Sequence, residues 1–332
     1  MSTFSPSARA LGLCSGGLDS ILSALLLKRQ GINVEWIAFE TPFFSSENAK
    51  GAAEKYAIPL MVRNITSVYI DMLKNPNCGY GKNMNPCLDC HTLMFKIAGE
   101  HIRNNAFDFV FSGEVLGQRP MSQTRHSLRY VEKNSGIDGY ILRPLSALNL
   151  PATIPEENGL VNRDELLGIR GKSRKEQIEL AHRFGVTGYP SPAGGCLLTD
   201  RGYCRRLNDL FDHQDAYSEN ELHLLKYGRH FRIDSQTKIV VGRNKKDNEG
   251  ILKHMDSGRD ILIKMKHVPG PVCIAPALSS PDIIKLAASL CAGYTKTPKG
   301  ESAEAVIGHS TSSYTIAVKP AEPDIVKPFL LL

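Results

Sequence analysis

Residues 10–20 read ALGLCSGGLDS, a short apolar run that leads directly into a glycine pair and then into a helical pattern. Leucines recur at helical spacing over residues 18–30, and Gly31 ends the pattern. Two glycines allow the backbone to turn tightly without a Cβ clash. Because a helix start offers unpaired N–H groups and the positive end of its dipole, this turn suits a phosphate group. The stretch therefore predicts a strand, a phosphate-binding loop and a helix.

Strand-like and helix-like segments alternate through the residues that follow. Residues 107–111 are wholly apolar, as in a strand buried in a parallel sheet. The other expected segments are strands at 34–39 and 60–65, and helices at 47–56, 88–104 and 174–184. This alternation predicts an α/β fold with a doubly wound, mostly parallel sheet. Prolines and turn residues within 145–160 predict a long surface connection.

The character of the chain changes near residue 200. Short β-like runs then replace the alternation, at 238–241, 261–264, 272–275 and 314–318, with one helix expected at 282–292. We therefore expect two domains, an α/β domain at 8–200 and a smaller α+β domain at 205–332. The length of 332 residues fits about two domains, each able to bury a core.

Composition narrows the class of protein. No stretch reaches the roughly 18 apolar residues that a membrane helix needs, and the first residues lack the pattern of a secretory signal. We therefore expect a cytoplasmic protein without a membrane partner. In a reducing compartment, eight cysteines favour metal binding or catalysis over disulfides. A net charge of +6 permits an RNA partner without requiring one.

The glycine turn and one later loop supply candidate nucleotide contacts. Asp19 is unexpected beside an anion, so we expect it to act through a bound Mg²⁺ or as a helix cap. The loop GEVLGQRPMSQT at 113–124 follows the buried strand, where ligands of open α/β sheets lie. Its polar side chains Glu114, Gln118 and Gln123 can position a base or a ribose. The alternatives are a plain strand-to-helix turn and a polar surface loop.

The string SGGLDS at 15–20 resembles the PP-loop of the ATP pyrophosphatases. That resemblance implies cleavage of ATP between its α and β phosphates, with a carbonyl oxygen activated as an adenylate and pyrophosphate released. It also implies a catalytic role for Asp19. The ATP-binding residues it implies are Ser15, Gly16, Gly17, Leu18, Asp19 and Ser20, and the loop at 113–124 adds Gly113 and Gln118 as ATP-binding candidates.

Three cysteines form a second candidate centre. Cys87 and Cys90 make a C-x-x-C pair at a predicted helix start, which favours thiolate, and Cys196 lies in a glycine-rich loop. Three thiolates can bind a [4Fe–4S] cluster and leave one iron open, whereas Zn²⁺ would need a fourth ligand. A redox or persulfide-carrying pair is the third alternative. Cys14, Cys204, Cys273 and Cys291 are expected to be buried structural residues.

The loop at 113–124 is similar to the G-E-x-L-G-Q-x-x-S-Q-T loop of tRNA 4-thiouridine synthases, and LRPL at 142–145 matches the same family. The resemblance covers about residues 8–200, without the family's usual N-terminal THUMP region or a rhodanese extension. It implies that Cys87, Cys90 and Cys196 are catalytic and hold a cluster that carries hydrosulfide. Because 2-thiouridine synthases share the cysteine arrangement, the position of thiolation on uracil stays open.

The second half of the chain carries a basic turn. Residues 238–248 read KIVVGRNKKDN, and a D-x-L motif and then a P-G-P motif follow further along the chain. These three motifs in this order resemble the NFACT-R RNA-binding domain, over about residues 205–300. Phosphate contacts are expected from Arg243, Lys245 and Lys246, with Arg229 and Arg232 as further candidates. Lys172 and Arg174 extend the expected RNA surface. Solvated turns of a β-rich domain are the alternative.

Together these features predict an ATP-dependent tRNA thiouridine synthase that uses Mg²⁺, a three-cysteine site and a sulfide or persulfide donor. The expected product is 4-thiouridine, formed when an adenylated uracil carbonyl exchanges oxygen for sulfur. A homodimer stays open. The alternatives are a tRNA 2-thiouridine synthase, an amide-forming adenylating enzyme for a small substrate, and a non-catalytic RNA-binding protein.

Overall fold

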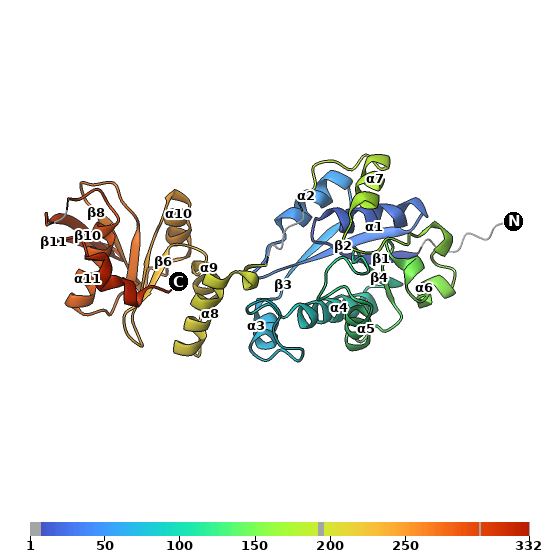
Figure 1. Cartoon of the computed structure of the whole chain (residues 1–332), viewed down its shortest axis with the longest axis horizontal. Coiled ribbons are helices and arrows are strands. Elements are labelled where there is room, and N and C mark those ends of the chain that lie inside the picture. Colours follow the sequence, from blue (N-terminus) through green and yellow to red (C-terminus); the bar gives the residue numbers. More distant parts are fainter. Residues whose placement is uncertain (1–7, 192–195, 299, 332) are drawn as a thin grey trace. The chain divides into compact units, whose positions relative to one another are not determined.

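A computed structural model describes residues 8–191, 196–298 and 300–331. The described residues form two units, which divide between Thr199 and Asp200. The first unit is an α/β domain and the second is built on an antiparallel sheet (Figure 1). No helix in the described part of the chain is long and apolar enough to cross a membrane.

The first unit contains a five-stranded parallel sheet with strand order β3-β2-β1-β4-β5. Its strands are β1 (Arg9–Leu13), β2 (Asn33–Glu40), β3 (Leu60–Asn64), β4 (Phe109–Ser112) and β5 (Ile141–Leu142). In the register of the sheet, Ala10 of β1 pairs with Val34 of β2 and with Phe109 of β4. The chain therefore winds outward from the central strand β1 in both directions, which confirms the predicted doubly wound fold.

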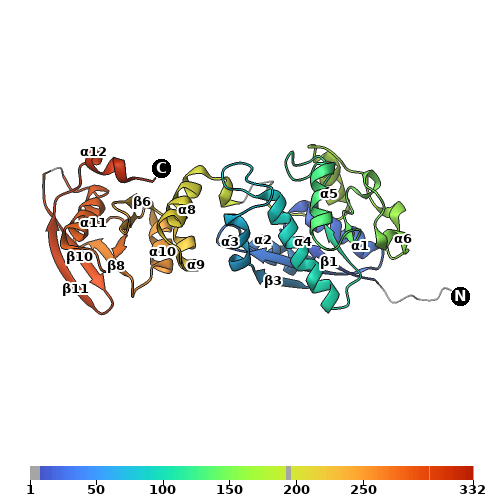
Figure 2. The same ribbon diagram turned by 90° about the horizontal axis from the view of Figure 1, so that it is seen from below.

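Helices cover both faces of this sheet. Figures 1 and 2 show α3, α4 and α5 on one face and α1 and α7 on the other. The α-helices of the unit are α1 (Leu18–Arg29), α2 (Glu47–Tyr56), α3 (Thr66–Lys74), α4 (Cys87–Asn104), α5 (Arg125–Asn134), α6 (Ile154–Glu157) and α7 (Lys175–Arg183). Short 3₁₀ turns follow at η1 (Ala147–Asn149), η2 (Arg163–Glu165) and η3 (Leu197–Thr199). The core includes fully buried Trp36, Leu22 and Phe111.

Helices α3 and α5 and one connection are among the features that the sequence did not predict. Each of the two helices buries only three residues, and their apolar pattern is thin. The prediction of a surface connection at 145–160 is correct only in part, since residues 148–152 and 156–160 are partly or fully exposed. This segment forms η1 and α6, and it buries Leu145 and Ala147 in the main core.

The second unit has a six-stranded antiparallel sheet with strand order β11-β10-β8-β9-β7-β6. The strands are β6 (Arg229–Arg232), β7 (Lys238–Val241), β8 (Asp260–Met265), β9 (Cys273–Pro276), β10 (Ala303–His309) and β11 (Ser312–Val318). The helices are α8 (Arg201–His213), α9 (Glu219–Leu224), α10 (Lys245–His254), α11 (Pro281–Gly293) and α12 (Pro323–Val326), followed by η4 (Lys327–Phe329). Helix α11 packs on one face of the sheet, and α9 and α10 pack on the other.

The basic segment after β7 is helical where the sequence predicted a turn. Asn244 caps α10, because its side chain accepts a hydrogen bond from the backbone N–H of Asp247 at 3.0 Å. Lys245 and Lys246 therefore lie in the first turn of a helix. Only three residues of α10 are buried, which explains why hydrophobic periodicity did not reveal it.

Candidate functional site

The glycine turn ends β1 and starts α1 with backbone N–H groups that no side chain caps. Gly16 adopts a φ of 72°, and a Cβ there would lie 2.2 Å from the backbone of Asn48, so only glycine fits. The Gly17 N–H bonds Ser15 Oγ at 3.4 Å, and the Ser20 hydroxyl donates to the Gly17 carbonyl at 2.8 Å. The Gly16 N–H also bonds a side chain, Cys14 Sγ at 3.3 Å. The tight curvature and the helix start that follows it are the features that suit phosphate binding.

Asp19, the acidic residue of this turn, is held by two side chains that are distant in sequence. Gln118 Nε2 donates to Asp19 Oδ2 at 2.8 Å, and Arg174 Nη2 lies 3.3 Å from Asp19 Oδ1. Gln177 on α7 supports this contact, since its Nε2 donates to Gln118 Oε1 at 2.8 Å. Asp19 lies in the first turn of α1, whose N-cap is Gly17. Both expected roles of Asp19, as a Mg²⁺ ligand or as a helix cap, therefore stay predictions.

This polar chain contains atoms without partners. Arg174 Nε and Gln177 Oε1 are buried, and neither has a hydrogen-bond partner within the described ranges. A buried polar group that lacks a partner costs about 1–3 kcal/mol, so such atoms at a phosphate loop suit a polar ligand. Arg174 was predicted to face RNA, but its observed partner is the PP-loop aspartate.

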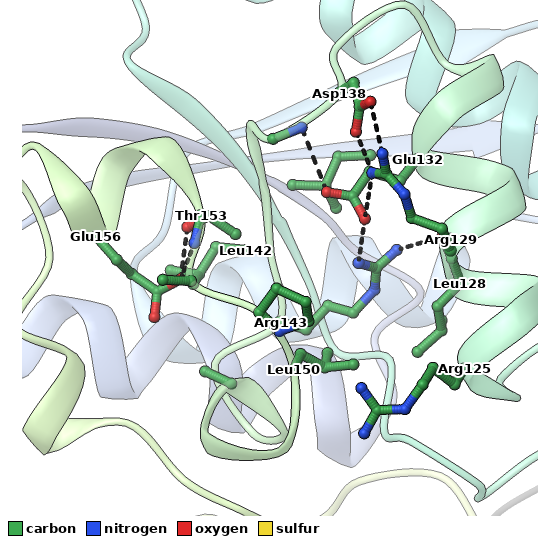
Figure 3. Close-up of a pocket in the computed structure, with 15 residues that line it drawn as sticks. Arg125, Leu128, Arg129, Glu132, Asp138, Leu142, Arg143, Leu150, Thr153 and Glu156 are labelled. Atoms are coloured by element: carbon green, nitrogen blue, oxygen red, sulfur yellow. Dashed lines mark hydrogen bonds and ion pairs between the residues drawn. The ribbon is translucent and has the colours of Figure 1, made fainter.

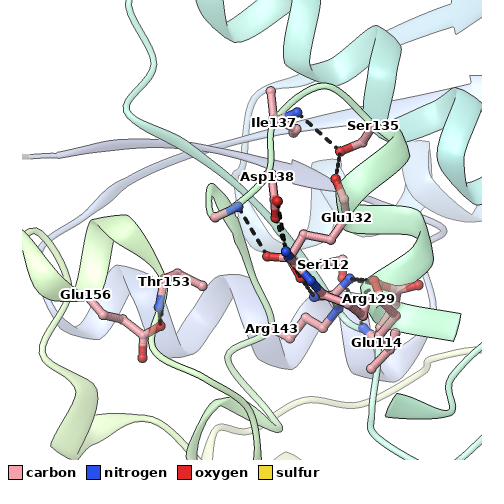
Figure 4. A network of polar contacts seen from close by, with 12 residues as sticks. Ser112, Glu114, Arg129, Glu132, Ser135, Ile137, Asp138, Arg143, Thr153 and Glu156 are labelled. Atoms are coloured by element: carbon pink, nitrogen blue, oxygen red, sulfur yellow. Dashed lines mark hydrogen bonds and ion pairs between the residues drawn. The ribbon is translucent and has the colours of Figure 1, made fainter. Parts of the chain in front are cut away.

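The loop after β4 packs directly against the glycine turn. A Cβ on Gly113 would lie 2.5 Å from the carbonyl carbon of Asp19, so this position requires the absence of a side chain. The next residue, Glu114, is buried and does not reach the turn. Its Oε2 lies 3.0 Å from Arg143 Nε, and its Oε1 lies 2.8 Å from His91 Nδ1 (Figure 4 shows the Arg143 side). Burial alone would raise the pKa of Glu114, but Arg143 and His91 lower it to about 2.

Glu114 is therefore a fixed anion that joins the loop to α4, which carries Cys87 and Cys90. This role differs from the base- or ribose-positioning role expected for it. Gln123 is buried as well, with its Oε1 unpartnered among the described residues. Arg119, further along the same loop, is exposed and lies close enough to Cys87 to lower the pKa of that thiol against the effect of burial.

The three candidate cysteines come together beside α3. The pKa of the Cys90 thiol is raised to about 12, mainly by burial and also by negative charge on Cys196 and Cys87, against the opposing effect of a hydrogen bond with Tyr69. Tyr69 lies near the same three cysteines. Burial raises the pKa of the Tyr69 hydroxyl, and negative charge on Cys90, Cys196 and Cys87 raises this pKa as well. The three sulfurs therefore lie within the range over which charges interact in a partly dehydrated site.

Two contacts hold the Cys196 segment near the helix that carries the other cysteines. Leu197 N–H donates to the Phe43 carbonyl at 3.2 Å, and Asn83 Nδ2 donates to the Thr199 carbonyl at 2.8 Å. Phe43 follows β2, and Asn83 lies just before α4. The glycines that precede Cys196, at 194 and 195, lie outside the described residues.

The fit of a metal or cluster depends on how these donors are spaced. Within the described ranges, no group of three or more His, Cys, Asp or Glu side chains is arranged to hold a metal ion. Three cysteine thiols have the donor type of a cluster ligated by three cysteines and equally that of a persulfide carrier, so the cluster stays a prediction. Cys14, Cys204, Cys273 and Cys291 are buried, as predicted, and Cys78 is exposed.

The basic residues of the second unit differ in their availability. Lys245 and Lys246 are exposed, and Arg243 is exposed while paired with Asp247 at 2.6 Å. Arg229 stacks over the ring of Tyr294 at 4.2 Å. Arg232 makes a two-point contact with Asp209 at 2.7 and 2.8 Å and is largely buried. Arg232 therefore supports the fold and does not present its guanidinium to a phosphate.

A pocket of about 670 Å³ lies beside the edge strand β5, away from the glycine turn (Figure 3). Its charged side chains pair with one another, since Arg129 contacts Asp138 and Glu132, and Arg143 lies 3.7 Å from Glu132. Figures 3 and 4 show these groups facing each other along one wall. The pocket does not include the glycine turn or the cysteines, so we do not assign it to the candidate site.

A parallel doubly wound sheet with a glycine turn between its central strand and an uncapped helix defines a class: PP-loop nucleotide-binding domains. Residues 5–152 match the family described as thiamine biosynthesis protein (ThiI), and residues 228–330 match the NFACT protein RNA binding domain. The first unit is thus a PP-loop domain of the ThiI type, and the second contains a domain of the NFACT type. The predicted resemblances are confirmed for these two ranges.

Individual proteins are similar to parts of this chain. A probable tRNA sulfurtransferase from Finegoldia magna is 32% identical over 150 residues, which are 42% of this chain and 36% of the relative. The tRNA-specific 2-thiouridylase MnmA from Nitrosomonas europaea is 22% identical over 81% of this chain and 77% of its own. The structure of NMN synthetase from Francisella tularensis has a TM-score of 0.35 and 15% identity, covering 66% of this chain and 83% of that one. The chain spans just over a third of the length of the sulfurtransferase.

Proposed function

We propose that this chain is an ATP-dependent tRNA thiouridine synthase with 4-thiouridine as its product. One observation carries the proposal: the loop after β4 contacts both chemical halves of the site. Gln118 in this loop bonds Asp19 at 2.8 Å, and Glu114 lies 2.8 Å from His91, the neighbour of Cys90. A nucleotide at the PP-loop and sulfur at the cysteines would then meet at one edge of the sheet.

The nucleotide half would activate the uracil carbonyl. Backbone N–H groups at the start of α1 and the guanidinium of Arg174 would bind the phosphates and orient the α-phosphorus. Asp19 would hold Mg²⁺, which neutralises phosphate charge when bound. The carbonyl oxygen attacks the α-phosphorus, the bond to the β-phosphate breaks, and pyrophosphate leaves. Gln118 and Gln177 keep the Asp19 carboxylate in place during this step.

The cysteine half would supply sulfur. Cys87, Cys90 and Cys196 would hold a [4Fe–4S] cluster, and an open iron would carry hydrosulfide when the cluster is bound. A sulfur anion held at these residues attacks the adenylated carbon of uracil, and the carbon–oxygen bond to AMP breaks. AMP leaves with the bonding electrons, and the thiocarbonyl forms after loss of the sulfur-bound proton. Zinc, or a persulfide on one cysteine, is the alternative at the same three residues.

The NFACT-type unit would bind the tRNA. Lys245 and Lys246 lie exposed in the first turn of α10, and Arg243 lies two residues before Lys245, so they can contact phosphates. Lys172, in the first unit, would also contact the tRNA. We propose that residues 8–200 catalyse the reaction, that residues 205–332 bind tRNA, and that the protein acts in the cytoplasm.

A second product is favoured by one specific observation. The similarity to the tRNA-specific 2-thiouridylase covers 81% of this chain, whereas the similarity to the sulfurtransferase covers 42%. We retain 2-thiouridine as the alternative product for this reason. Both products require the same adenylation and the same sulfur centre.

The test is an anaerobic reaction of the full chain with ATP labelled at the α-phosphate, unmodified tRNA, sulfide and ferrous iron. We expect labelled AMP that depends on tRNA, and 4-thiouridine in the nucleosides identified by mass spectrometry. Appearance of 2-thiouridine would select the alternative product. AMP formation without tRNA would favour an amide-forming enzyme, and the absence of AMP under all conditions would favour a non-catalytic RNA-binding protein. The absorption and EPR spectra of the anaerobically purified chain test the cluster.

A further inference from the structure

Tyr69, on α3, is a residue that the sequence did not single out and that the proposed reaction has not used. Its side chain is fully buried. The ring packs against Phe43 with centroids 5.6 Å apart and meets Phe44 edge-on at 5.4 Å. Two aromatic rings from the connection after β2 therefore fix the ring, so the phenolic oxygen has a defined position.

The hydroxyl of Tyr69 lies at the cysteine centre. The sulfur of Cys90 is its neighbour, and Cys196 and Cys87 are close enough to act on it electrostatically. Apart from its contact with the Cys90 sulfur, Tyr69 Oη has no hydrogen-bond partner over the described ranges. Most buried tyrosine hydroxyls find a partner, because an unpaired one costs about 1–3 kcal/mol.

We infer that Tyr69 is a positioning residue whose hydroxyl donates a hydrogen bond to an anionic sulfur atom held at Cys87, Cys90 and Cys196. This inference rests on the proposed function, since it assigns a further contact to the same sulfur centre. The shared chemistry is a sulfur anion, which is either hydrosulfide on an iron–sulfur centre or the terminal sulfur of a cysteine persulfide. In both forms, the buried O–H replaces a hydrogen bond that water would otherwise supply.

The competing explanation is that Tyr69 only fills space among Phe43, Phe44 and the start of α4. The substitution Tyr69→Phe separates the two, because it keeps the ring and removes only the hydroxyl. Tyr80→Phe is the matched control. The Tyr80 hydroxyl donates to the Leu73 carbonyl at 2.6 Å, and its side chain is 45% exposed.

The experiment measures how long each full-length variant retains sulfur. One arm loads the protein anaerobically with ferrous iron and sodium sulfide, and the other uses polysulfide, which transfers one sulfur atom to a thiol and becomes shorter by one. Labile sulfur is counted after desalting, at increasing times. In whichever arm the wild type takes up sulfur, we expect Tyr69→Phe to lose this sulfur about tenfold faster than the wild type. Tyr80→Phe should lose it at the wild-type rate.

A second measurement distinguishes a hydrogen bond from packing. The absorption spectrum of the loaded sulfur, with EPR in the iron arm, should shift in Tyr69→Phe and not in Tyr80→Phe. Unfolding followed by the fluorescence of Trp36, the single tryptophan, should show that both variants fold. If Tyr69→Phe keeps sulfur and spectrum unchanged while the wild type loads, Tyr69 only packs and the inference is wrong. If the wild type loads in neither arm, the sulfur centre itself fails, and the role of Tyr69 fails with it.

Discussion

The two sides of the candidate site are built on opposite principles. On the nucleotide side, Asp19 has a partner on each oxygen, and the loop that joins this side to the other carries Glu114, an anion whose pKa is lowered to about 2. On the sulfur side, burial raises the pKa of Cys90 to about 12, and the Tyr69 hydroxyl has no hydrogen-bond partner among the described residues apart from its contact with the Cys90 sulfur. The nucleotide side is organised by charged groups that are already paired within the protein. The sulfur side keeps its thiols and its tyrosine hydroxyl neutral until a metal ion or a sulfur donor binds.

This contrast matters for the order in which the two sides become active. The nucleotide side holds its charges in place before ATP arrives, which lowers the reorganisation that binding requires. A thiol with a pKa near 12 stays protonated at neutral pH, so a metal ion or a sulfur donor must displace the proton. The sulfur side is therefore expected to depend on loading, and the nucleotide side is not. Substitutions on either side should reveal this difference. They are described below from the largest expected effect to the smallest.

Cys196→Ala should separate the two sides completely. We expect thiolation to fall below detection while tRNA-dependent formation of AMP persists, because the substitution leaves the PP-loop interactions intact. Cys78→Ala, at an exposed cysteine, is the control and should thiolate normally. The measurement is mass spectrometry of nucleosides beside thin-layer analysis of labelled AMP. Thiolation by Cys196→Ala at the wild-type level would remove this residue from the mechanism.

Glu114→Gln should weaken the joint between the two sides. It leaves the guanidinium of Arg143, which is 3% exposed, without its nearest carboxylate, a change that typically costs about 3–5 kcal/mol. Urea unfolding followed by Trp36 fluorescence reports on the first unit and measures this loss.

The same variant gives a pH test with a definite sign. The pKa of Glu114 falls from 4.5 to about 2 on folding, so its contribution to stability is present above pH 4.5 and declines as the pH drops toward 2. The stability difference between wild type and Glu114→Gln should therefore shrink across this interval. A difference that stays constant from pH 5 to pH 2 would contradict the assigned ion pair.

Asp19→Asn should lower the rate of AMP formation by about 100-fold, since removing one electrostatic group at a reacting centre has effects of this size. Loading of sulfur at the cysteines should not change, because the Asp19 carboxylate is held by Gln118 and Arg174 on the nucleotide side. Labelled AMP and labile sulfur are measured on the same preparation. Equal loss of both quantities would show that the two sides are not independent.

Gln177→Met should have a smaller effect, of about tenfold, on AMP formation. The substitution keeps the shape of a fully buried side chain and removes the 2.8 Å bond to Gln118. Gln30→Met is a control that removes two hydrogen bonds to the backbone of Asn162, far from Asp19 in the fold. Steady-state kinetics should show the change in Gln177→Met alone. An equal effect in both variants would indicate general destabilisation.

Replacing Lys245 and Lys246 together by alanine should weaken tRNA binding only a few-fold at physiological salt. Each lysine–phosphate interaction that the substitution removes should reduce the slope of log affinity against log salt by about 0.7–0.9. Titrations at several salt concentrations measure this slope. Lys296→Ala, at another basic residue of the same unit, is the control for the loss of a positive charge elsewhere in the unit. An identical slope in the wild type and in both variants would exclude α10 from the RNA interface.

The sequence was most informative where function depends on neighbouring residues. SGGLDS predicted the strand, turn and helix correctly, because glycines and a helix start are local features. The C-x-x-C pair was correctly expected at a helix start, and α4 begins at Cys87. The fold class followed from alternation, which is also readable over short windows.

Contacts between distant segments were not readable in this way. Arg174 meets Asp19 across 155 residues, and Gln177 meets Gln118 across 59. Tyr69 reads as an ordinary apolar residue of a short helix, and only the fold brings it to the cysteines. Lys245 and Lys246 were assigned to a turn, because the cap at Asn244 was not recognised and α10 has few buried residues.

The eight cysteines also divide by access to solvent. Cys78 is exposed and Cys87, Cys90 and Cys196 are half-buried, whereas Cys14, Cys204, Cys273 and Cys291 are buried. A small reagent that alkylates thiolates should therefore label the first set faster than the second in the native protein, with Cys90 the slowest of the first set because burial raises its pKa. Counting labels by intact mass would give an inexpensive check on whether a preparation carries an occupied centre, because occupancy removes three positions from the first set and none from the second.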